Sequence, residues 1–236
     1  MCSIDITFDF YSDTPKGQDP DRHSPTLRRY HRTLWSKPLP DGFLFDLSDK
    51  KPGAYLHYCS IKGEFFLSSD AIGHTYRHVK AMEPIVSQIP EVEMDAFYRL
   101  CSTIGAYIIF PSRQVQGGMT INAARGFSRQ IRDRFDLTLE CIRRHYTGLD
   151  SPLADVLQRY APFFELFADF NGYVDFFLLQ DLVDARGNIK FFLPCEDFSR
   201  SPLPQDVTEY RCYMESLSAF VRARNQRILR AVQSCE

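Results

Sequence analysis

The sequence predicts an α+β fold, in which a small, mainly antiparallel sheet is covered by several helices and the C-terminal half is rich in helix. Short alternating or apolar segments, separated by glycine and proline turns, are concentrated in the first half of the chain. Longer segments with apolar residues every three or four positions dominate the second half. Strands and helices segregated in this way favour α+β over a doubly wound α/β sheet.

The predicted strands are short and mostly lie before residue 118. The first alternates apolar with polar side chains, as a half-buried strand does. The segment IGAYIIFP, residues 104–111, is apolar throughout and predicts a fully buried strand. The predicted strands cover residues 3–10, 43–47, 55–60, 64–67, 104–111 and 189–193.

The predicted helices are recognised by their apolar stripes and by their starts. Ser24-Pro25 and Ser151-Pro152 combine a capping serine with a proline that suits the first helical turn. Asn171-Gly172 marks a break between helices in the apolar segment 163–184. The main predicted helices cover residues 25–35, 71–86, 91–101, 119–146, 153–163 and 207–232. The whole chain, residues 1–236, is expected to form one globular domain.

Residues 119–146, which we call the central segment, carry the most distinctive pattern. Apolar residues from Phe127 to Tyr146 recur at steps of three or four and predict one long helix. The segment also holds six arginines, several of them four residues from a carboxylate. Such pairs can be a solvated, salt-bridged helix face and nothing more, because each is worth only about 0.2–0.5 kcal/mol.

Three arginines of the central segment suggest a second interpretation, an anion site. Arg125, Arg134 and Arg143 have no carboxylate four residues away, and unpaired guanidinium groups suit phosphate or carboxylate. The turn at Gly117-Gly118 could bring backbone N–H groups to the same ligand. His31 and His145 are the candidate acid–base residues of such a site. His31 also lies on an apolar helix face, where a histidine is commonly a hydrogen-bonded core residue.

Two groups of residues have the composition of a metal site. Asp70, His74 and His78 are spaced by four in a predicted helix, which would place them on one face. Helix capping by Asp70 and a polar surface explain the same residues. Asp13, Asp19 and Asp21 lie in a loop whose spacing does not match a calcium loop, so a polar loop explains them. No metal and no cofactor is therefore assigned from the sequence.

Asp175 has apolar or aromatic neighbours on both sides in the sequence, Tyr173-Val174 and Phe176-Phe177. A buried carboxylate needs a partner. We therefore predict that Asp175 is buried and paired with an arginine of the central segment, Arg134 or Arg143 in particular. The alternative is that Asp175 points to solvent.

The totals limit the classes of protein. The net charge is −2, and the halves on either side of residue 118 have 13 cations with 14 anions and 15 cations with 16 anions. This balance disfavours broad nucleic-acid binding. Seven scattered cysteines without a C-x-x-C pair indicate reduced thiols in a cytoplasmic protein. The sequence shows neither a signal peptide nor a membrane span, so no membrane partner is expected.

Five segments of the chain resemble a family of uncharacterised bacterial proteins that is described as a domain of unknown function. They are TLRRYHRTLWSKPLP, LSSDAIGHTYR, TIGAYIIFP, DRFDLTLECIRRHY and GYVDFFLLQDLV. The resemblance covers nearly the whole chain. It implies one stand-alone domain in the bacterial cytosol and brings no activity, cofactor or catalytic residue.

Two function hypotheses of different class follow. The first is an enzyme or sensor that binds a small phosphorylated anion or nucleotide through the central segment. The second is a non-catalytic module for protein–protein interaction or a structural role, which the high aromatic content of 14% fits. RNA binding is a weaker third hypothesis, because it needs a continuous positive groove. The sequence does not indicate the oligomeric state.

Overall fold

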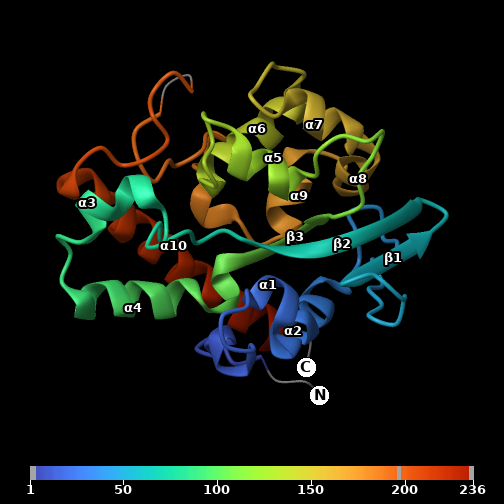
Figure 1. The fold of residues 1–236 in the computed structure, drawn as a ribbon. Coiled ribbons are helices and arrows are strands. Elements are labelled where there is room, and N and C mark those ends of the chain that lie inside the picture. Colours follow the sequence, from blue (N-terminus) through green and yellow to red (C-terminus); the bar gives the residue numbers. More distant parts are fainter. Residues whose placement is uncertain (1–3, 196–197, 234–236) are drawn as a thin grey trace.

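A three-stranded antiparallel sheet lies at the centre of the fold (Figure 1). The computed structural model describes residues 4–195 and 198–233. Strand β1 (Leu56–Ser60) pairs with β2 (Gly63–Ala71), and β2 pairs with β3 (Tyr107–Pro111). The central strand β2 is the longest, and every residue of β3 is buried. The α+β prediction is confirmed.

Helices cover both faces of this sheet. In Figure 1, α5 to α9 lie on one side of the strands, and α1, α2 and α4 lie on the other. The long C-terminal helix packs against α4 and against the short turn that precedes β3. The helices are α1 (Pro20–His23), α2 (Pro25–Trp35), α3 (Glu83–Val86), α4 (Glu91–Cys101), α5 (Ile121–Phe127), α6 (Phe135–Thr147), α7 (Ala154–Arg159), α8 (Ala161–Phe164), α9 (Phe170–Phe176) and α10 (Val207–Gln233). Short 3-10 turns are η1 (Phe10–Asp13), η2 (Lys80–Met82), η3 (Ile104–Ala106), η4 (Glu165–Phe167) and η5 (Gln180–Leu182).

Where local signals were strong, the predicted elements agree with the structure. Helix α2 begins as expected, because the Ser24 side chain accepts a hydrogen bond from the backbone N–H of Leu27 and Pro25 occupies the first turn. Helices α4 and α10 match the predicted ranges 91–101 and 207–232 to within a residue. The second half of the chain is helix-rich, as predicted.

Three predicted strands do not form. Residues 3–10 alternate in polarity, yet the described part of this segment is loop that leads into η1, and the backbone N–H of Phe10 bonds to the carbonyl of Ser102. Residues 43–47 and 189–193 contribute only isolated bridges, Pro38 to Leu44 and Val183 to Ile189. In each case one side of the segment packs on the core, but no strand lies alongside to complete a ladder.

The predicted helix at residues 71–86 is wrong in its first half. Strand β2 continues through Asp70 and Ala71, which pair with Ile108 and Tyr107 of β3. The backbone N–H of Ile72 then donates to the carbonyl of Ala106 at 2.7 Å. These sheet hydrogen bonds outweigh the weak helical preference of a stretch rich in β-branched and aromatic residues. A helix forms only at α3.

The central segment is broken into α5 and α6 rather than forming one helix. Arg132 and Asp133 have positive φ angles of 45° and 61°, which no α-helix contains. Two side chains hold the break, since the Tyr76 hydroxyl donates to the Arg132 carbonyl at 3.0 Å and Arg125, on α5, donates to the Asp133 carbonyl at 3.1 Å. Phe127, predicted on the buried stripe, is therefore 76% exposed.

Candidate functional site

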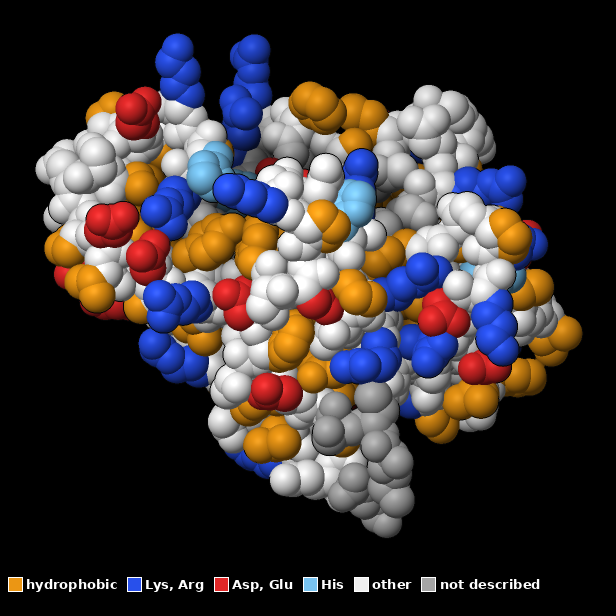
Figure 2. Space-filling view, turned by 60° about the horizontal axis from the view of Figure 1, so that its bottom comes forward, with side chains coloured by type: hydrophobic (Ala, Val, Ile, Leu, Met, Phe, Trp, Pro, Cys, Tyr) orange, Lys and Arg blue, Asp and Glu red, His pale blue; other side chains and the backbone are white. Residues whose placement is uncertain are grey.

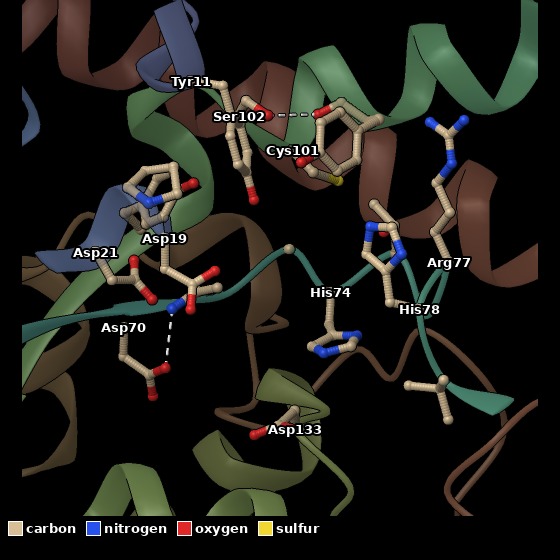
Figure 3. A pocket seen from close by; sticks show the side chains of 17 residues that line it. Tyr11, Asp19, Asp21, Asp70, His74, Arg77, His78, Cys101, Ser102 and Asp133 are labelled. Atoms are coloured by element: carbon tan, nitrogen blue, oxygen red, sulfur yellow. Dashed lines mark hydrogen bonds between the residues drawn. The ribbon is translucent and has the colours of Figure 1, made fainter. Parts of the chain in front are cut away.

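A cavity of about 330 Å³ opens on the side of the sheet where β2 ends (Figure 3). Its walls come from the segment 11–21, from the end of β2 with the loop that follows, from the end of α4 and from the break in the central segment. We call it the aspartate pocket. Its polar walls include Asp19, Asp21, Asp70, His74, His78 and Asp133.

The pocket joins the two groups that the sequence singled out separately. Asp19 and Asp21 are placed by the start of α1, where Pro20 occupies the first helical position. Asp70 lies at the end of β2, and His74 and His78 lie in the loop that follows β2. The second group does not have the predicted geometry, because residues 70–78 are not helical. Asp13, in contrast, leaves the pocket and accepts bonds from the Ser24 hydroxyl and the Thr26 N–H.

A chain of buried hydrogen bonds ends at Asp21. The indole N–H of Trp35 donates to Nδ1 of His31 at 3.0 Å. Because a neutral imidazole carries one proton, Nε2 of His31 must hold it and donate to Oγ of Ser69, also at 3.0 Å. The Ser69 hydroxyl is then free to donate to Oδ1 of Asp21, at 3.3 Å. No pattern in the sequence indicated this role of Ser69.

This chain gives His31 a structural role in place of the predicted catalytic one. Burial, with a smaller contribution from the nearby Arg224 guanidinium, lowers the pKa of His31 to about 3. Both ring nitrogens are occupied, and the side chain is fully buried. His31 therefore stays neutral near pH 7 and has no free lone pair with which to accept a substrate proton.

Asp21 has the most strongly perturbed carboxyl group in the pocket. Burial, and then the neighbouring Asp19 carboxylate, raises its pKa from 3.8 to about 7. The bond from Ser69 and the positive charges of Arg125 and Arg22 oppose this rise. A carboxyl group that titrates near neutral pH can both give and take a proton there, which is the property of an acid–base residue.

His74 faces the pocket from the opposite side. Its Nδ1 accepts the backbone N–H of Tyr76 at 3.1 Å, so that Nε2 carries the proton of the neutral ring. Burial lowers the pKa of His74, the Asp133 carboxylate opposes this effect, and His78 lowers the pKa further. Figure 3 shows the His74 ring above Asp133. His74 is thus a neutral hydrogen-bond donor near pH 7.

Arg125, predicted to bind an anion, instead binds groups of the protein beside this pocket. Its guanidinium is fully buried and forms an ion pair with Asp70. It also donates to the hydroxyl of Thr138 at 2.9 Å and to the carbonyls of Asp133 and Ala71 at 3.1 and 3.3 Å. Because its donors are engaged by the protein, Arg125 shapes the walls of the pocket and does not present a guanidinium to a ligand.

Arg134 and Arg143 lie elsewhere. Arg134 is buried and clamps the carboxylate of Asp136, and its remaining donors bind the carbonyls of Leu193 and Pro202. Arg143 is partly exposed and shares the carboxylate of Glu140 with Arg144. A separate cleft of about 210 Å³ adjoins that trio. The three predicted anion-binding arginines therefore do not converge.

His145 and Asp175 are also apart from the aspartate pocket. His145 is half-buried against the ring of Phe164, and burial lowers its pKa while Glu165 opposes this. Asp175 is exposed on α9 and accepts a hydrogen bond from Gln180 at 2.8 Å. The predicted buried pair of Asp175 with an arginine is wrong, because the apolar neighbours of Asp175 turn to the core on the other side of α9.

Within residues 4–195 and 198–233, no cluster of three or more His, Cys, Asp or Glu side chains has the geometry of a metal site. In the same ranges, no helix is both long and apolar enough to cross a membrane. Cys101 and Cys141 are buried thiols, whereas Cys59 and Cys212 are exposed. Cys2 and Cys235 lie outside the described residues.

Comparison with known proteins bears on the family and not on the activity. Residues 4–228 match the model of a family of unknown function, DUF6994. The chain belongs to this family. Neither a curated protein nor a solved structure matches it. A function for this member of DUF6994 therefore has to be argued from the pocket itself.

Proposed function

We propose that the aspartate pocket binds a small organic cation and that Asp21 exchanges a proton with it, as the acid–base residue of an enzyme. The observation that carries this proposal is the position of Asp21. Its carboxyl group lies in the wall of a cavity, and it is held by a buried chain of hydrogen bonds from Trp35 through His31 and Ser69. Fixed orientation and a shifted pKa are what acid–base catalysis requires.

The charge of the lining favours a cation. Four aspartates contribute to the walls, and Arg125 neutralises one of them, Asp70. The one arginine in the lining, Arg77, already forms an ion pair with Asp95 at 3.0 Å. The side chains of Asp19 and Asp133 thus leave the pocket negative. A phosphorylated anion would be repelled from it, and an ammonium group attracted.

The aromatic residues of the rim suit the same ligand. Tyr11 and Tyr98 both line the pocket, and their ring centroids lie 5.0 Å apart. Tyrosine rings attract cations through their π faces. Burial raises the pKa of both hydroxyls, so the two rings are neutral at physiological pH and available as hydrogen-bonding groups. The cavity volume, about 330 Å³, suits a small metabolite and not a nucleic acid.

Thermal unfolding with a panel of ligands tests the binding part of the proposal. Small amines such as putrescine and choline should raise the Tm, whereas inorganic phosphate and glycerol 3-phosphate should not. Asp19→Asn should weaken the effect of the amines. Asp175→Asn is the matched control, because Asp175 is an exposed aspartate on the far element α9. Stabilisation by the phosphates but not by the amines would contradict the proposal.

Calorimetric titration tests the proton exchange without knowledge of the reaction. A bound cation favours the ionised form of Asp21, so binding at pH 7 should release about half a proton from a group whose pKa is about 7. Titrations of the amine in two buffers with different enthalpies of ionisation measure that release. Asp21→Asn should bind with no proton release. Equal release by wild type and variant would exclude Asp21 as the exchanging group.

The other predicted functions are less well supported by the geometry. Anion binding by the central segment stays a prediction for Arg143 alone, since the donors of Arg125 and Arg134 are engaged inside the protein. A non-catalytic interaction module also stays a prediction, and light scattering at several concentrations would test self-association. On the face shown in Figure 2, basic side chains alternate with acidic and hydrophobic ones and form no continuous band, which RNA binding would need.

A further inference from the structure

A second cavity, of about 320 Å³, lies between the start of β2, the end of β3 and the α7–α8 corner. None of the residues of the aspartate pocket contributes to it. Its lining combines apolar and aromatic side chains with arginine. We call it the arginine pocket, and its main walls are Phe65, Phe66, Val115, Tyr160, Arg113 and Arg159.

Both arginines of this cavity lack a carboxylate partner among the described residues. The Arg113 guanidinium lies over the ring of Phe66, 4.7 Å from its centroid, and forms no ion pair. Arg159 donates only to the backbone carbonyls of Asp155 and Met119, each at 3.2 Å, and its Nε is buried without a hydrogen-bond partner. Two positive charges therefore face one cavity uncompensated.

The other charged groups in the lining do not neutralise them. Glu64, the one acidic residue there, already binds His57 at 2.8 Å and Lys51 at 3.3 Å. Lys62, the third cation of the lining, forms an ion pair with Asp41 at 2.6 Å. The surplus of positive charge thus belongs to Arg113 and Arg159.

The Arg159 guanidinium packs against the glycine turn before α5 and donates to the Met119 carbonyl at 3.2 Å. A Cβ atom at Gly118 would lie 2.7 Å from Nε and Cζ of Arg159, so only glycine lets the guanidinium lie flat against this turn. The sequence had connected Gly117-Gly118 with an anion site on the central segment. The arginine beside this turn is Arg159 from α7 instead. A guanidinium held in one orientation binds a planar anionic group with little loss of side-chain entropy.

We propose that the arginine pocket binds an aromatic anion, a small molecule in which a carboxylate or phosphate is attached to a flat ring. The anionic group would accept hydrogen bonds from Arg113 and Arg159. The ring would pack among Phe66, Tyr160 and Val115, whose side chains form the apolar part of the cavity. The anionic half of such a ligand does not suit the negatively charged aspartate pocket, and the two cavities share no lining residue, so this site is independent of the function proposed there.

Titration followed by NMR chemical shifts, with four named probes, tests this inference. Benzoate and phenyl phosphate carry both features, inorganic phosphate carries only the charge, and benzyl alcohol carries only the ring. We expect the two aromatic anions to bind and to shift the resonances of Val115 and Tyr160. Comparable affinity for inorganic phosphate or for benzyl alcohol would overturn the proposal, as would no binding of either aromatic anion. Whichever of benzoate and phenyl phosphate binds with the higher affinity would identify the preferred anionic group.

Variants assign the binding to the two arginines. Arg113→Gln and Arg159→Gln should each lower the affinity for the aromatic anion by about tenfold, because each variant loses charge-assisted hydrogen bonds. Gly118→Ala should have a similar effect by displacing Arg159, with the cation itself retained. Arg211→Gln is the matched control, since Arg211 forms a surface pair with Glu93. Unchanged affinity in Arg113→Gln and Arg159→Gln, with native circular dichroism, would refute the inference.

The same titrations separate this inference from the function proposed for the aspartate pocket. Asp21→Asn should leave the affinity for benzoate unchanged, because Asp21 does not line the arginine pocket. Loss of benzoate binding in Asp21→Asn would place the anion in the wrong cavity and overturn the inference. Failure of the amines to bind would refute the proposed function while leaving the binding of benzoate to be judged by its own variants.

Discussion

Asp21→Asn should raise the free energy of unfolding above that of the wild type. The difference should appear at neutral and alkaline pH and be absent at acidic pH. The wild-type carboxyl group is held in a site where burial and the Asp19 carboxylate disfavour its charge. Asparagine has almost the same shape and keeps an oxygen that can accept the hydrogen bond from Ser69. The substitution therefore removes the charge and leaves the buried chain of hydrogen bonds in place.

The size of this effect follows from the shift in pKa. In the unfolded chain Asp21 ionises near its ordinary pKa of 3.8, whereas in the folded protein it holds its proton up to about pH 7. Between these values the folded state binds one more proton than the unfolded state. The free energy of unfolding therefore falls as the pH rises, by about 1.4 kcal/mol for each pH unit. Over the whole interval the loss is about 4 kcal/mol, and it is complete above pH 7.

Urea unfolding at pH 4 and at pH 8 measures the prediction. Trp35, the one tryptophan of the chain, is fully buried, so its fluorescence reports on the core. Wild type and Asp21→Asn should have similar free energies of unfolding at pH 4, and the variant should be more stable by about 4 kcal/mol at pH 8. Asp175→Asn, at an exposed site, should show no such difference. If the difference between Asp21→Asn and wild type is the same at both pH values, the description of Asp21 as a buried titrating group is wrong.

Three further predictions concern two residues beside the aspartate pocket and one glycine of α9. Arg125→Met should lower the free energy of unfolding by about 3–5 kcal/mol, because Asp70 loses its partner, and adding Asp70→Asn should restore part of it in urea titrations. Ser69→Ala removes a hydrogen bond that favours the ionised carboxylate, so the pKa of Asp21 should rise, and a carbon-13 NMR titration that finds it unchanged would count against the buried chain. Gly172→Ala should cost at least about 1–3 kcal/mol in the same unfolding assay, because a Cβ atom there would lie 2.0 Å from a backbone oxygen of the preceding turn.

The parts of the fold that the sequence predicted well are those with local causes. Helix α2 has its capping serine and its proline next to each other in the chain, and an apolar stripe on one face. Strand β3 is a short apolar run rich in β-branched and aromatic residues, a pattern typical of a buried strand. The alternation in residues 3–10 was misleading, because alternation shows that one side is buried and not that a neighbouring strand exists to pair with.

The break in the central segment has no local cause, and for that reason its apolar period did not reveal it. The carbonyl groups that a helix would have satisfied are bonded by Tyr76, which is far away in sequence, and by Arg125. The candidate site depends on the same kind of contact. Asp21 and Ser69 are separated by 48 residues and meet only because α1 packs on β2. Residue types pointed to both acidic groups of the pocket, but only the fold could show that they face each other.

The pairing pattern of the arginines was misinterpreted because only carboxylates were considered as their partners. An arginine without a carboxylate four residues away was expected to bind a ligand, but the five N–H donors of a planar guanidinium can also bind several carbonyls at once. Arg125 and Arg134 each bind two backbone carbonyls as well as a carboxylate. Arg224, in the middle of α10, is fully buried, contacts no carboxylate among the described residues and binds the carbonyls of Phe177, Gly105 and Tyr107.

This use of arginine follows from the small sheet. A fold with three short strands contains many irregular segments whose buried carbonyls find no partner in a ladder. Lysine has only three donors, all on one nitrogen, so it reaches fewer separate carbonyls than the five donors of a planar guanidinium. The second half of the chain, with 14 arginines and Lys190 as its one lysine, is where these segments pack around α6 and α10. An arginine therefore indicates a ligand site only where it lines a cavity without a carboxylate partner, and among the described residues Arg113 and Arg159 meet that condition.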